Sequence, residues 1–197
     1  PKKLNIKGEE EFIGRGVSYC AVCDGAFYQD KTVAVVGGGN AAIEEAIYLT
    51  KFAKKAYVIH RRNELRADKI IQERAKKNKK LEFIFDTVVE EIIGNDVVNK
   101  LKIKNVKTNE TAILETDGIF PYIGITPNIS AINGQVQQDE NGFIITDETM
   151  KTSIDGVYAV GDVRKTPLRQ VITAASDGAI GAVYAEKYIE SLEKVLV

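Results

Sequence analysis

Two cysteines three positions apart are the first feature of this sequence that could carry chemistry. Cys20 and Cys23 are the only cysteines among 197 residues, and Asp24 follows them directly. A disulfide between them would close too short a loop to stabilise a fold, and structural zinc needs four ligands where the chain offers two Cys and one His. Inert buried cysteines and a redox dithiol are the alternatives. The Asp24 carboxylate is near enough to shuttle a proton when a thiolate leaves, so we expect Cys20, Cys23 and Asp24 to be catalytic, with no metal bound.

A glycine-rich turn is the second feature. Gly37-Gly-Gly-Asn-Ala-Ala42 fits G-x-G-x-x-A, directly after a β-branched run at 32–36 and before a helical pattern over 41–54. Gly37 permits the tight turn, Gly39 lets the backbone approach a pyrophosphate, and Ala42 permits close helix packing. Because a second strand is expected over 56–59, the stretch is a βαβ unit and predicts a dinucleotide site; a plain loop is the alternative.

The end of the second strand indicates which dinucleotide binds. An NAD site usually places Asp or Glu there, but this chain has His60, Arg61 and Arg62, with Arg66 a turn later. Guanidinium groups offer paired donors to a 2′-phosphate, so the pattern favours NADPH; a surface network of salt bridges is the alternative. His60 is better explained as part of this phosphate pocket than as a base.

Features near the C-terminus favour a flavin. A nicotinamide delivers two electrons at once whereas disulfide exchange runs through thiolates, so linking them normally requires a flavin. Gly161 and Asp162 follow an expected strand over 156–160 and offer a carboxylate to a ribityl or ribose hydroxyl. A helix is expected to begin near Gln170.

The elements that must position these residues predict an α/β fold. A charged helix is expected over 64–77. Short strands separated by polar turns predict an antiparallel meander beside the βαβ core, at 81–85, 88–93, 101–106 and 112–114. Further strands at 119–123 and 156–160, with an apolar stretch at 143–145 between them, precede an Ala-rich helix over 171–196. A change in the pattern of polar and apolar residues at Asp117 predicts two domains, 1–117 and 118–197.

The composition limits the classes of partner. The chain has 27 basic and 28 acidic residues, a balance that argues against a nucleic-acid or anionic-membrane binder. No apolar run approaches the roughly 18 residues of a membrane span, and the N-terminus lacks a signal-peptide core. We therefore expect a cytoplasmic protein with no nucleic-acid or membrane partner.

The order of these motifs resembles that of bacterial low-molecular-weight thioredoxin reductases, over nearly the whole chain. The motifs are Cys20-Ala-Val-Cys-Asp-Gly, Gly37 to Ala46, His60-Arg-Arg-Asn-Glu-Leu-Arg-Ala, Ile123-Gly-Ile-Thr-Pro-Asn, Gly156-Val-Tyr-Ala-Val-Gly-Asp-Val and Arg169-Gln-Val. The resemblance implies an NADPH-dependent flavoprotein disulfide reductase. Electrons would pass from NADPH to FAD, then to Cys20 and Cys23, then to thioredoxin.

The resemblance also implies roles for single residues. Cys20 and Cys23 would form the active-site disulfide, with Cys23 nearer the flavin, Cys20 attacking thioredoxin and Asp24 donating a proton. Glu44 would lie near the nicotinamide, Arg61, Arg62 and Arg66 at the 2′-phosphate, and Asp162 at the flavin ribityl chain. The full set of cofactor-binding residues is then Gly37, Gly39, Asn40, Ala41, Glu44, His60, Arg61, Arg62, Arg66, Gly124, Gly161, Asp162, Arg169, Gln170 and Val171.

The chain also departs from the family's pattern. Val22 stands where Thr is common, and Ser176 stands where the family has Gly. The family begins with a glycine loop for the FAD pyrophosphate, so we expect 1–117 to be a Rossmann-like NADPH-binding domain with the redox centre and 118–197 to be an incomplete FAD-binding domain. Hinges are expected near 1–5 and 115–119.

Three questions stay open at this point. The family forms homodimers chiefly through its FAD domain, so whether this chain dimerises is undecided. The flavoprotein subunit of alkyl hydroperoxide reductase shares the same module and is an alternative identity. A third reading is an NADPH-binding module that binds no flavin and performs no turnover.

Overall fold

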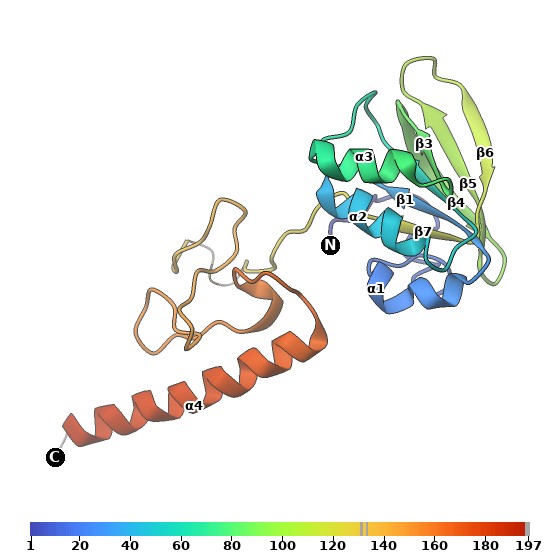
Figure 1. Cartoon of the computed structure of the whole chain (residues 1–197). Coiled ribbons are helices and arrows are strands. Elements are labelled where there is room, and N and C mark those ends of the chain that lie inside the picture. The colour runs from blue at the N-terminus through green and yellow to red at the C-terminus, as the bar shows by residue number, and fades with distance from the viewer. Residues whose placement is uncertain (131, 133, 196–197) are drawn as a thin grey trace. The chain divides into compact units, whose positions relative to one another are not determined.

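The computed structural model describes residues 1–130, 132 and 134–195. The chain divides into two compact units, Pro1–Ile125 and Thr126–Val197 (Figure 1).

A parallel sheet forms the centre of the first unit. Its strand order is β3-β2-β1-β7, and every neighbouring pair is parallel. The bounds are β1 Thr32–Val36, β2 Lys55–Ile59, β3 Leu81–Ile84 and β7 Gly118–Pro121. The first two strands and the helix between them confirm the predicted βαβ unit.

Side chains of β1 alternate between two apolar layers, which explains why the strand is apolar throughout. Val33 and Val35 pack toward α2 (Asn40–Leu49) and α3 (Lys69–Lys77), whereas Ala34 and Val36 pack toward a second sheet. That sheet is antiparallel, in the order β4 (Thr87–Gly94), β5 (Val98–Asn105) and β6 (Thr111–Glu115). Figure 1 shows the helices and the antiparallel sheet on opposite faces of the parallel sheet. The α/β class and the antiparallel meander are therefore confirmed.

Several predicted boundaries differ. The segment 81–85, expected in the meander, joins the parallel sheet as β3 because it pairs with β2. The helix expected from Glu64 begins at Lys69, because the backbone N–H groups of Arg66 and Ala67 both donate to Gly38 O at 2.7 and 3.0 Å and hold this stretch as a loop. The helix expected to reach 54 ends at Leu49.

The division between units falls after Ile125, whereas the sequence predicted a boundary at Asp117. The strand β7 accounts for the difference, because it pairs with β1 in register from Val33–Gly118 to Val36–Pro121. The division of the chain between an NADPH and an FAD domain stays a prediction.

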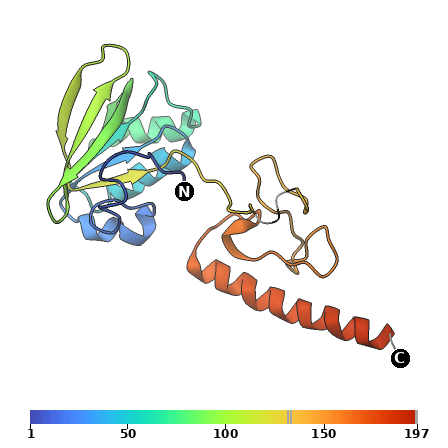
Figure 2. The same cartoon turned by 180° about the vertical axis from the view of Figure 1, so that it is seen from behind.

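The second unit contains one long helix and little other regular structure (Figure 2). The helix α4 spans Val171–Val195, close to the predicted range, and a 3-10 turn, η2, spans Gly161–Val163. The strand expected at 156–160 is wrong: within it, only Tyr158 pairs with a described residue, in an isolated bridge with Lys151. The apolar stretch at 143–145 likewise forms only isolated bridges to described residues, both through Ile144. A strand needs a neighbour along its whole length, and these segments have none in the described part of the unit. No helix among the described residues is long and apolar enough to cross a membrane.

Candidate functional site

The two cysteines form a disulfide that closes a single helical turn. Cys20 caps α1 (Ala21–Asp24), with 5.3 Å between the Cα atoms of Cys20 and Cys23. The N–H of Cys23 donates to the Sγ atom of Cys20 at 3.1 Å. Cys20 is half-buried and Cys23 exposed. Because the bond joins neighbours on one turn, it can open without releasing distant parts of the chain.

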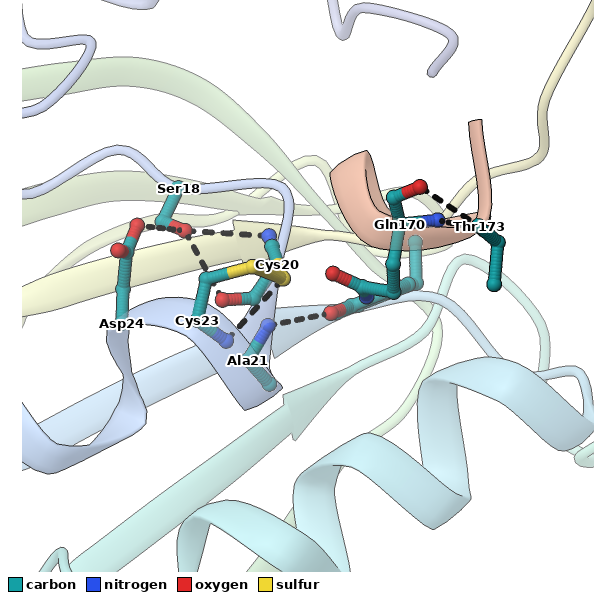
Figure 3. Close-up of a disulfide and its surroundings, with 8 residues drawn as sticks. Ser18, Cys20, Ala21, Cys23, Asp24, Gln170 and Thr173 are labelled. Atoms are coloured by element: carbon teal, nitrogen blue, oxygen red, sulfur yellow. Dashed lines mark hydrogen bonds between the residues drawn. A yellow bond between two sulfur atoms is a disulfide. The ribbon is translucent and has the colours of Figure 1, made fainter. Parts of the chain in front are cut away.

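Asp24 is held beside the disulfide by a hydroxyl group. Ser18 Oγ donates to Asp24 Oδ2 at 2.6 Å and accepts the backbone N–H of Cys20 at 3.1 Å, as Figure 3 shows. Ser18 is buried and Asp24 is half-buried. The structure thus brings together Cys20, Cys23 and Asp24 as predicted, and adds Ser18, which the sequence analysis did not identify.

Tyr122 is a second contact that the sequence analysis missed, because it was expected only as an apolar strand residue. Its hydroxyl accepts the N–H of Ala21 at 2.8 Å. Burial raises the pKa of Tyr122 to about 12, with further increases from the charges of Glu45 and Asp24, so the phenol is neutral at ordinary pH. The sequence signal was a polar atom within an otherwise apolar run. Tyr122 anchors the turn that carries the disulfide.

The glycine turn after β1 is shaped by close contacts on two of its three residues. A methyl group on Gly37, whose φ is +150°, would strike the carbonyl oxygen of Tyr122, and one on Gly38 would lie 2.5 Å from the ring of His60. A methyl group on Gly39 would meet nothing within 4 Å. The turn therefore needs glycine at its first two positions, and the third faces open space where a ligand can approach.

A cavity of about 430 Å³ lies at this turn, entirely within the first unit. Three separate motifs meet there: the glycine turn after β1, the basic segment after β2, and the end of β7. Its lining residues are Lys2, Leu4, Val36, Gly37, Gly38, Ile59, His60, Arg61, Arg66, Thr87, Val88, Val89, Tyr122 and Ile123. Every charged side chain among these described residues is positive, as an anionic ligand requires.

The other predicted nucleotide residues of this unit lie outside that lining. They are Gly39, Asn40, Ala41, Glu44, Arg62 and Gly124, of which Asn40 is engaged with Asp68 through two hydrogen bonds of 2.8 Å. These bonds join the start of α2 to the residue before α3. Asn40 therefore positions the loop that carries the arginines.

His60 forms part of the cavity wall and is buried. Burial lowers the pKa of His60, and the charge of Arg66 lowers it further, so the imidazole is neutral. Its Nε2 atom has no hydrogen-bond partner among the described residues. A buried polar atom without a partner is costly, so a ligand or water that bonds it stabilises the site. This atom, the open face of Gly39 and the positive lining fit a phosphate-bearing nucleotide.

The residues predicted to contact flavin lie together in the second unit. Gly161 and Asp162 form η2, and the Arg169 guanidinium lies 4.0 Å from the ring centroid of Phe143, with Nε donating to the Asp162 carbonyl at 3.4 Å. The N–H of Gln170 donates to Thr173 Oγ1 at 3.1 Å (Figure 3), and Val171 is 87% exposed at the start of α4.

A partly buried ion pair holds this segment and was also missed from the sequence. Asp177 accepts bonds from Arg164 Nε at 2.6 Å and Nη2 at 3.0 Å, and from the N–H of Gly161 at 3.0 Å. The bond from Arg164 holds the pKa of Asp177 below its ordinary value. The available signal was an acidic residue on the same helix face as Ala174 and Gly181, which pack closely against Gly161 and Val160.

Comparison with known proteins gives a consistent result. The sequence model of the family described as pyridine nucleotide-disulphide oxidoreductase matches residues 1–178. The thioredoxin reductase of Peptoclostridium litorale is 51% identical over 98% of this chain and 63% of its own length. The crystal structure of the Streptococcus pyogenes thioredoxin reductase matches with a TM-score of 0.92 and 51% identity, over 96% of this chain and 62% of that one.

A more distant match is a ferredoxin-flavin thioredoxin reductase from Clostridium acetobutylicum. It is 31% identical with a TM-score of 0.53, over 97% of this chain and 61% of that one. The chain thus spans just over three-fifths of the length of the relatives it matches.

Proposed function

The chain belongs to the pyridine nucleotide-disulphide oxidoreductase family, and on that premise we propose that it carries the redox and nucleotide-binding parts of an NADPH-dependent thioredoxin-disulfide reductase. Membership implies flavin and nicotinamide cofactors, which we assign as FAD and NADPH. One observation carries the proposal: a single compact unit holds both the disulfide and a positively lined cavity, and Tyr122 both lines the cavity and bonds Ala21 in the turn that the disulfide closes. The proposed setting is the cytoplasm, whose reducing conditions suit a redox dithiol.

The preference for NADPH rests on the arginines of the cavity. Arg61 and Arg66 line it beside the glycine turn, at the end of β2, where the ribose of a bound dinucleotide lies. Both are exposed within the first unit and can offer paired donors to a 2′-phosphate. Arg62 completes the basic segment, and Asn40, Ala41 and Glu44 lie on the helix that follows the turn. These residues form the proposed NADPH site.

The second unit is the proposed contribution to the FAD site. Gly161 and Asp162 would contact the ribityl chain, and Arg169, Gln170 and Val171 would line the ring system. The exposure of Val171 and of Ile172, 87% and 75%, supports this assignment, because large apolar side chains at the start of a helix are suited to covering an aromatic ring.

The chemistry that follows belongs largely to the disulfide. When bound, NADPH and FAD would supply two electrons to the Cys20–Cys23 disulfide, which would open to two thiols with the uptake of two protons. The Cys20 thiol gives its proton to the Asp24 carboxylate and attacks, as a thiolate, one sulfur of the thioredoxin disulfide. A mixed disulfide forms, and the other thioredoxin sulfur leaves as a thiolate that takes this proton from Asp24. The Cys23 thiol attacks Cys20 next, and its proton passes to the second thioredoxin sulfur as that sulfur leaves. This step restores the intramolecular disulfide and releases thioredoxin as a dithiol. Ser18 orients the Asp24 carboxyl group during these steps.

Nucleotide binding tests the proposal directly. The purified chain is titrated with NADPH and with NADH by isothermal calorimetry, in the wild type and in Arg61→Ala. We expect the variant to bind NADPH about 10- to 100-fold more weakly and NADH unchanged, because only the 2′-phosphate loses a charge-assisted hydrogen bond. Arg74→Ala, on the exposed end of α3 and outside the cavity, is the matched control.

The nucleotide affinities, the flavin absorbance and the turnover together separate the reductase from the alternative functions. Equal, weak binding of both nucleotides by the wild type would contradict the proposal and favour a reductase fed by another donor, such as ferredoxin. A flavin absorbance band that bleaches with NADPH, followed by thioredoxin reduction that Cys20→Ser abolishes, would establish turnover. Selective NADPH binding without a flavin band would limit this chain to the nucleotide and dithiol parts.

A further inference from the structure

The cavity has a third positive residue that neither the motifs nor the proposed NADPH site assigns. Lys2 lines it together with Arg61 and Arg66, and no acidic side chain occurs among the described lining residues. The neighbouring lysines are already paired: Lys3 Nζ lies 2.7 Å from Glu10, and Lys7 Nζ lies 2.6 Å from Glu91. Within the described residues no carboxylate lies in ion-pair distance of Lys2. Its ammonium group is therefore available to an anionic ligand.

The backbone that carries Lys2 is fixed by hydrogen bonds at Lys2 and just after it. The N–H of Lys2 donates to the carbonyl of Gly124 at 2.8 Å. Glu9, which is 1% exposed, accepts the N–H groups of Leu4 at 2.8 Å and Asn5 at 2.7 Å. These bonds, at Lys2 itself and at Leu4 and Asn5, hold the segment as a wall of the cavity. Less conformational entropy is then lost when the lysine contacts a ligand.

Because Gly124 has no side chain, the side chain of Lys2 can lie against its backbone. A methyl group on Gly124 would lie 3.4 Å from Cδ and 4.0 Å from Nζ of Lys2, so the stem of the lysine lies against the bare Cα of this glycine. Gly124 has a φ of +122°, a conformation that favours glycine independently. Lys2 thus sits just beyond the end of β7.

The strand order determines which phosphate group of the nucleotide Lys2 can reach. Arg61 follows β2 and Gly124 follows β7, and these strands flank β1, whose end carries the glycine turn. A dinucleotide crosses such a sheet with its pyrophosphate at the turn and its two nucleosides on opposite sides. The 2′-phosphate belongs to the side of Arg61. Lys2 therefore approaches from the other side.

We propose that Lys2 is a further nucleotide-binding residue, which supplies a positive charge to the pyrophosphate from the β7 side of the glycine turn. The inference rests on the proposed NADPH function and deepens it. It separates two roles within one cavity: Arg61 and Arg66 select the 2′-phosphate, and Lys2 binds the group that NADPH and NADH share.

Calorimetric titration of Lys2→Ala and Lys2→Gln with NADPH and with NADH tests this separation. We expect both variants to bind both nucleotides about three- to tenfold more weakly, with the preference for NADPH unchanged, since a partly exposed charge contact is modest and the pyrophosphate is common to both ligands. The loss should shrink in high salt, because added ions screen an exposed charge. Lys3→Ala is the matched control, one residue away and paired with Glu10 outside the cavity.

Other outcomes overturn the inference in distinguishable ways. If the wild type prefers NADPH but both Lys2 variants bind as the wild type does, Lys2 has no role and the proposed function stands. If the variants lose NADPH selectively, Lys2 belongs to the 2′-phosphate site and the assignment to the pyrophosphate is wrong. If the wild type itself binds both nucleotides weakly and equally, the proposed function fails and this inference fails with it. Unchanged thermal unfolding of the variants ensures that a loss reports binding.

Discussion

Replacing Asp177 by Asn tests whether one ion pair holds the candidate flavin segment in place. The carboxylate of Asp177 accepts two bonds from Arg164 and one from the backbone of Gly161, and the Arg164 and Asp177 side chains are 16% and 11% exposed. Removing one partner of a fully buried pair costs about 3–5 kcal/mol, because the remaining charge is left uncompensated. This pair lies near the surface and Asn keeps one acceptor, so we expect a loss of about 2 kcal/mol, below that range.

Hydrogen exchange read by mass spectrometry measures this loss where it occurs. A loss of about 2 kcal/mol raises the open population about 30-fold, so the amides of η2 and its flanks should exchange faster by up to that factor. Asp155→Asn is the matched control: Asp155 pairs with Lys151, but its side chain is 78% exposed, and exchange should change by less than about twofold. Equal exchange in Asp177→Asn and the wild type would refute the reasoning that this pair fixes the segment.

The same pair predicts how acid affects the second unit. The hydrogen bond from Arg164 lowers the pKa of Asp177 in the folded chain, so the unfolded chain binds the proton more readily. Stability from the pair is therefore present above the ordinary carboxyl pKa and is lost as the pH falls below about 4. Far-ultraviolet circular dichroism should show this loss as a fall in the helical signal of α4. In Asp177→Asn, the part of the acid-induced loss that comes from this carboxyl group should be absent.

Two further predictions concern the first unit. Tyr122→Phe removes the acceptor of the buried Ala21 N–H, so the free energy of unfolding should fall by about 1–2 kcal/mol in a urea titration; an unchanged midpoint would mean that water replaces the hydroxyl. His60 is the only histidine, and because its pKa is lowered in the folded chain, the unfolded chain takes up a proton at a higher pH. The free energy of unfolding of this unit should therefore fall as the pH drops below about 6.5, and His60→Gln should flatten that pH dependence.

The sequence predicted the elements whose signals are local. The apolar run at β1, the glycine turn and the helix after it are adjacent in the chain, and their spacing alone specifies a βαβ unit. The motif Cys20-Ala-Val-Cys23 likewise fits within one turn of helix, so its geometry needs no distant partner. For the same reason α4 was predicted nearly to its observed bounds.

Features that depend on distant partners could not be read in this way. The pattern at 81–85 fits an edge of either sheet, and only pairing with β2 decides between them. Asp177 gives no local sign that Arg164, thirteen residues earlier, folds back onto it. The strand pattern at 156–160 was misleading because an apolar, β-branched segment can also pack as an irregular loop against a helix, as Val160 does against Gly181.

The residues on either side of Cys20 link the disulfide to the nucleotide cavity. Ala21 donates its N–H to Tyr122, whose carbonyl confines Gly37 of the glycine turn. Tyr19 donates its hydroxyl at 2.8 Å to Glu9, the same carboxylate that fixes the segment carrying Lys2. Each neighbour of Cys20 is therefore bonded to a residue that shapes the cavity wall. Substitutions at Tyr122 and Glu9 should affect disulfide reactivity and nucleotide affinity together, and their effects should be non-additive because the two contacts restrain the same turn.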